Sequence, residues 1–159
     1  MEFEEKGFAV ASWRNVIISL WRGAVTVPRL DELVRRERAL KARSPRGIVP
    51  FTIVCDVPTE MLKVGEVERK RASEIATEMG PFTIAHPNVV LGGGFWGATV
   101  RGVMSAAYLV SRAKYPTKAF DSIAGACAWV VPLIGKAGET EPGAHEMSAE
   151  LEAVVRGER

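Results

Sequence analysis

The most suggestive spacing in this 159-residue chain is the glycine-rich run at residues 92–97, which reads Gly-Gly-Gly-Phe-Trp-Gly. A G-x-G-x-x-G turn between a strand and a helix can direct backbone N–H groups at a phosphate. Here the run does not open an early strand–helix–strand unit, and Phe95 and Trp96 would crowd a pyrophosphate. We therefore interpret the glycines as a chain turn that lets the next helix pack closely, with phosphate binding as the alternative.

Other patterns of catalysis or metal binding are missing from the sequence. His86 and His145 are the two histidines, and neither has a cysteine or histidine neighbour at ligand spacing. Ser105 falls within a predicted helix with no base nearby, and no nucleophile-elbow motif is present. We expect no metal, no cofactor and no enzymatic activity.

Charge and cysteine usage limit the remaining classes. The net charge is only +2, and no aromatic residues interleave the basic Arg35-Arg36 pair, so nucleic acid is not an expected partner. Arg101 interrupts the most apolar helix, which leaves no run of about 18 uncharged apolar residues for a membrane span. Cys55 and Cys127 sit in apolar runs, which favours buried thiols and predicts a cytoplasmic protein.

The hydrophobic periodicity predicts the element order β-β-α-β-α-β-α-β-α. Thr26 and Ser122 are candidate N-caps, and Gly80-Pro81 is a helix stop. The predicted elements lie at about residues 7–13, 16–21, 26–43, 51–55, 65–79, 82–91, 95–113, 117–120 and 122–134.

The predicted helix at residues 95–113 is apolar on two faces, which indicates burial on more than one side. A single sheet face cannot cover both of them. The second face is therefore predicted to meet either the helix expected at 122–134 or another molecule. Its candidate interface residues are Phe95, Trp96, Thr99, Gly102, Ala106 and Tyr108.

The segment at residues 136–159 has a different composition. Acidic residues outnumber basic ones, and Gly and Pro occur early. Met147, Leu151 and Val154 form only a short helical pattern, too few apolar residues for a core. We expect one domain over residues 1–135 and a flexible acidic tail with a marginal helix at 136–159.

The order of elements resembles the STAS / SpoIIAA-like domain, the small α/β fold of bacterial anti-sigma-factor antagonists. The likeness is carried by the hairpin at residues 15–23 before the first helix, the strand at 51–55 before a helix-entry loop, and the closing strand and helix at 117–130. The resemblance spans about residues 8–135. It implies a single α/β domain with a mixed sheet and helices packed mainly on one face.

In those antagonists, a Ser or Thr in the loop after this strand is phosphorylated to switch partner binding. The matching positions here are Asp56 and Thr59, which the resemblance makes a possible phosphorylation loop. The usual Ser-Gly pair is missing, and Glu60 would repel an added phosphate. A turn and cap role for Asp56 and Thr59 is therefore the favoured interpretation.

These observations predict a non-catalytic regulatory or scaffolding module that acts through protein–protein contact, with a homodimer as one form of it. The alternative is a carrier of a small apolar ligand or lipid, with the helix at 95–113 lining the pocket.

Overall fold

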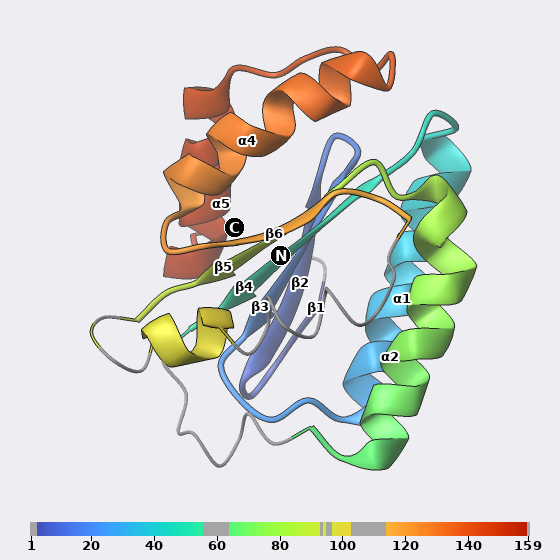
Figure 1. Cartoon of the computed structure of the whole chain (residues 1–159), viewed down its shortest axis with the longest axis vertical. Helices are drawn as coiled ribbons and strands as arrows, with labels where there is room; N and C mark the ends of the chain where they lie inside the picture. The colour runs from blue at the N-terminus through green and yellow to red at the C-terminus, as the bar shows by residue number, and fades with distance from the viewer. Residues whose placement is uncertain (1–2, 56–63, 93, 95–96, 103–113, 159) are drawn as a thin grey trace.

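The computed structural model describes residues 3–55, 64–92, 94, 97–102 and 114–158. Its centre is a six-stranded mixed sheet in the order β1-β2-β3-β4-β5-β6 (Figure 1). β1, β2 and β3 are antiparallel, whereas β3 to β6 run parallel. The strands are β1 (Phe3–Glu5), β2 (Phe8–Trp13), β3 (Val16–Trp21), β4 (Val49–Val54), β5 (His86–Val90) and β6 (Thr117–Phe120). The α/β class and the mixed sheet predicted from the sequence are confirmed.

Two helices cover one face of this sheet: α1 (Val27–Arg43), between β3 and β4, and α2 (Glu66–Met79), between β4 and β5. Adjacent parallel strands joined in sequence by right-handed crossovers place their helices on the same face. The 3₁₀ turn η2 (Gly80–Phe82) ends α2 at the predicted Gly80-Pro81 stop. Residues 97–102 are helical and precede β6.

The opposite face is covered by α4 (Ile123–Lys136) and α5 (Ala144–Arg156), so the sheet lies between two helical layers (Figure 1). The expectation that helices pack mainly on one face was therefore wrong. The physical reason is that successive residues of β3, β4 and β5, which point to opposite faces, are mostly buried, and a sheet that is buried on both faces needs two covering layers.

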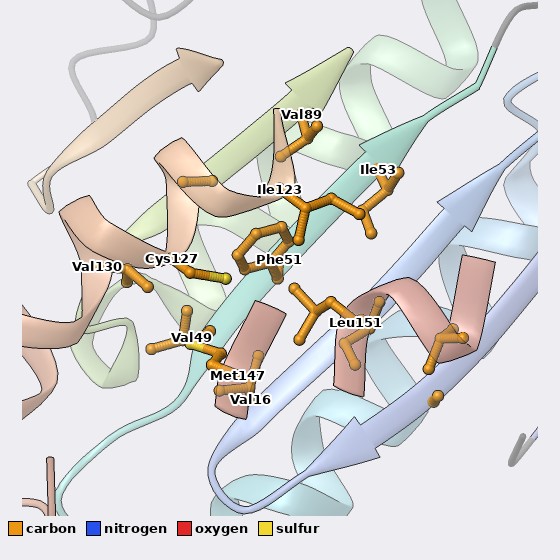
Figure 2. Packing of buried hydrophobic residues seen from close by; sticks show 14 of the residues in the cluster. Val16, Val49, Phe51, Ile53, Val89, Ile123, Cys127, Val130, Met147 and Leu151 are labelled. Carbon is orange, nitrogen blue, oxygen red and sulfur yellow. The ribbon is translucent and has the colours of Figure 1, made fainter. Parts of the chain in front are cut away.

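The two layers enclose two separate groups of buried residues. On the α1 and α2 side, Leu30 and Val34 of α1 pack over Phe8 and Ile17 of the sheet. On the other side, Phe51 and Ile53 of β4 point toward Cys127 and Ile123 of α4 and toward Leu151 of α5 (Figure 2). The core thus depends on both ends of the chain.

The segment expected to be a flexible tail contributes a core helix. Met147 and Leu151 of α5 have exposed fractions of 0%, and Val154 has one of 1%. Their spacing places them on one side of a helix, as the sequence pattern indicated, and that side lies on the sheet next to α4. An ion pair of 3.1 Å between Arg14 and Glu146 joins α5 to the β2–β3 turn. The predicted flexible tail and its boundary after residue 135 were wrong. Three buried side chains are enough to dock α5 on the sheet, because α4 lies beside it and covers the rest of that face.

Within the described parts of the chain, the helices are all too short or too polar to cross a lipid bilayer.

Candidate functional site

The outer side of α4 is the surface feature that stands apart from the rest of the described molecule. Its inner side is core, formed by Ile123, Ala126, Cys127, Val130, Val131 and Ile134. Its outer side is exposed and formed by Ala124, Gly125, Ala128 and Pro132, with Trp129 and Leu133 partly exposed at the border. No charged residue occurs between Ile123 and Gly135. Solvent therefore faces an uncharged helix surface, which we call the outer side of α4.

The two ends of this surface carry opposite charges. Asp121 precedes the helix and Lys136 is its last residue, and both are exposed. Ser122 is the N-cap that the sequence predicted, and its Oγ accepts a hydrogen bond of 3.3 Å from the Gly125 N–H. An acid at the N-terminal end and a lysine in the last turn also match the helix dipole. The ends are thus well defined, and the charges lie where the helix favours them.

Local contacts hold the border of the outer side in place. The ring centroids of Trp129 and Phe120, the latter on β6, lie 5.4 Å apart, and the two rings are tilted. The Lys118 Nζ lies 5.2 Å from the centroid of the Phe120 ring. Pro132 has no N–H and therefore donates no helical hydrogen bond to the Ala128 carbonyl. The outer side thus offers an aromatic edge and small residues.

An open depression of about 390 Å³ lies where the start of α4 meets the end of α5. Its lining combines apolar and charged residues: Leu91, Asp121, Ser122, Ile123, Ala124, Glu152, Val155 and Arg156. It adjoins the outer side of α4 at Asp121 and Ala124. The depression is open and is bordered by exposed charges, which suits a polar contact rather than an enclosed apolar ligand.

A second cluster is polar and lies on the sheet face that α1 and α2 cover. The Ser19 hydroxyl donates to Thr52 Oγ1 at 3.3 Å, and Thr52 Oγ1 lies 2.9 Å from His86 Nε2. Desolvation lowers the pKa of His86 to about 4, so its imidazole is neutral at physiological pH. No group of three metal-binding side chains occurs in the portion of the chain that the structure describes. The cluster is a hydrogen-bonded link between three strands.

Glu37 is the buried charge that the sequence analysis missed. Its side chain lies on the inner side of α1 between Val34 and Leu40, and the residue is 4% exposed. Its Oε2 has no hydrogen-bond partner among the residues described. Burial, followed by repulsion from Glu78, raises the pKa of Glu37 to about 7. The helical spacing from Val34 to Glu37 to Leu40 was a signal that could have revealed its burial.

The two cysteines are free thiols. Cys127 is buried in α4, and burial raises its pKa to about 12. Cys55 is partly buried at the end of β4, where burial also raises the pKa although Arg22 opposes the shift. A high pKa keeps a thiol protonated and weakly reactive. The expectation of buried thiols is thus confirmed for Cys127 and met only in part by Cys55.

Only some of the residues singled out from the sequence lie in the parts of the chain that the structure describes. Asp56, Thr59, Phe95, Trp96, Ala106 and Tyr108 lie outside the described residues. Thr99 and Gly102 are exposed on the helical segment at 97–102. No described atom lies within 4 Å of a Cβ built at Gly102. The surface formed by the six candidate interface residues therefore stays a prediction.

The glycine run has a packing explanation at its last position. A Cβ built on Gly97 would lie 2.2 Å from the Gly92 carbonyl oxygen, which no side chain tolerates. Gly97 is thus required by the close return of the chain, in line with the interpretation of the run as a turn.

Comparison with family models, curated proteins and solved structures gives no match to this chain.

Proposed function

We propose that this protein is a non-catalytic regulatory or scaffolding module that acts through protein–protein contact, and that the outer side of α4 is its contact surface. The observation that carries the proposal is the exposure of uncharged residues on a helix whose other side is core. A surface helix normally presents charged or polar residues to water. Uncharged apolar patches on soluble domains mark interaction sites.

The resemblance to STAS / SpoIIAA-like domains supports the regulatory part of this proposal. The resemblance rests on the element order predicted from the sequence, and β2, β3, α1, β4, α2, β5, β6 and α4 follow one another in that order. Thr99 and Gly102, which the sequence assigned to a partner interface, are accessible and form a second proposed contact area. The regulatory role is carried by this likeness, and the contact surface by α4.

Native mass spectrometry of the purified full chain tests the proposal. We expect a homodimer or a complex with a co-purified protein. The alternative function, carriage of a small apolar ligand or lipid, would instead give a monomer with a bound small molecule. A monomer without a protein partner at any concentration tested would contradict contact-based action.

A further inference from the structure

We propose that the outer side of α4 binds the same surface of a second copy, with the two α4 helices antiparallel around a two-fold axis. This inference rests on the proposed function and deepens it by naming the partner. A two-fold interface must be complementary to itself, because both copies use the same surface. If one residue contacts a second residue of the other copy, the same contact also forms with the copies exchanged. The outer side of α4 meets that requirement in charge and in shape.

The charge requirement is met by the two ends of the helix. Asp121 lies at the N-terminal end and Lys136 at the C-terminal end, and both are exposed. An antiparallel pair places Asp121 of each copy beside Lys136 of the other, which makes two opposite-charge pairs at the rim. A parallel pair would place like charges together. The antiparallel arrangement also opposes the two helix dipoles favourably.

The shape requirement is met by the residues between these ends. With Asp121 facing Lys136 of the second copy, Gly125 faces Pro132 four residues further in. At the centre, Ala128 faces Trp129 of the second copy. Small residues thus lie opposite larger ones along the whole line, which permits close helix approach. The uncharged centre and polar rim are the usual anatomy of a protein interface.

The other helices do not offer an equivalent surface. The exposed sides of α1 and α2 carry ion pairs, such as Arg38–Glu78 at 2.6 Å and Arg71–Asp31 at 2.7 Å. The exposed side of α5 carries Arg156 with Glu152. Covering these sides would remove charged groups from water at a cost. Among the described helices, α4 is the one that a second copy can cover without desolvating a charged centre.

Charge reversal at the two ends tests the arrangement by sedimentation velocity on the full chain. Asp121→Lys and Lys136→Asp each replace two attractive pairs by two repulsive ones, so each variant should weaken the dimer roughly tenfold or more at low salt. The double variant restores opposite charges across the axis, and its dimer should return to near the wild-type strength. Raising the salt concentration should reduce the differences, because rim charges are screened.

Matched controls separate a specific contact from a change in net charge. Glu66→Lys and Lys70→Asp reverse exposed charges on α2, and dimer strength should be unchanged in both. Thermal melts check that every variant is folded. Single reversals without effect, or a double variant as weak as the singles, would overturn this arrangement while a wild-type dimer still supports the proposed function. A wild-type chain that binds only a different protein would also overturn it, again without harming the proposed function.

Discussion

Removal of residues 136–159 is expected to destroy the cooperative fold. The deletion removes α5, and with it the buried side chains of Met147, Leu151 and Val154. Val16 of the sheet, which lies beside Met147, would lose this cover (Figure 2). Each lost apolar side chain is worth about 2–5 kcal/mol, against a total stability of about 5–15 kcal/mol for a domain. We expect an insoluble or molten product without a sigmoidal denaturation curve.

Two further variants make this prediction specific. Leu151→Ala should keep the fold but lower the free energy of unfolding by about 3 kcal/mol, as measured by chemical denaturation. Removal of residues 157–159 alone should lower the free energy of unfolding far less, because it removes no buried side chain and costs only the C-cap of α5 and the exposed Arg156–Glu158 ion pair. A deletion of 136–159 that still unfolds cooperatively would show that the sheet and α4 form a sufficient core.

The second large effect concerns Glu37 and pH. Its pKa is about 7 in the folded protein and 4.5 is the ordinary value, so the folded state holds the proton over this interval and the unfolded state does not. The free energy of unfolding therefore falls as pH rises from 4.5 through 7, by about 3 kcal/mol in total. Glu37→Gln carries a neutral group of the same shape and should be more stable than wild type by about that amount near pH 8.

The difference between Glu37→Gln and wild type should vanish below pH 4.5, where both side chains are neutral. The comparison must be with wild type at each pH, because His86 also makes stability depend on pH. The pKa of His86 is lowered to about 4, so its contribution to the free energy of unfolding is lost as pH falls from 6.5, whereas that of Glu37 is lost as pH rises. Glu78→Gln is a useful companion, because Glu78 repels Glu37 and its removal should shift the transition to lower pH. A Glu37→Gln variant with the same pH profile as wild type would show that the carboxylate is not held protonated.

The sequence predicted much of the fold because local signals were strong. The β2–β3 turn, the N-cap positions of Thr26 and Ser122 and the stop at Gly80 occur where the residues indicated, although the Thr26 side chain makes no capping hydrogen bond. Strand β1 was missed because Phe3–Glu5 is short and acidic, and it is a strand only by pairing with β2. Local pattern cannot reveal an element that a neighbouring strand creates.

The second helical layer was missed for a related reason. The stripe in α5 was recognised, but its burial depends on α4 lying beside it, and this is a tertiary fact. The outer side of α4 shows the same limit. Periodicity alone does not say which side of an apolar helix the sheet and α5 will cover, so the exposure of Ala128 and Pro132 could be known only from the structure.

Sedimentation velocity of the full-length Ala128→Glu variant is the most direct test of α4 as a contact surface. Ala128 is exposed, so a glutamate is tolerated in the free chain but would be buried, unpaired, in the complex. The matched control is Ala76→Glu, which changes an exposed alanine in the last turn of α2 on the opposite side of the sheet. We predict that Ala128→Glu is folded and sediments as a monomer at concentrations where wild type and Ala76→Glu are associated. Association of Ala128→Glu equal to that of wild type would contradict the assignment.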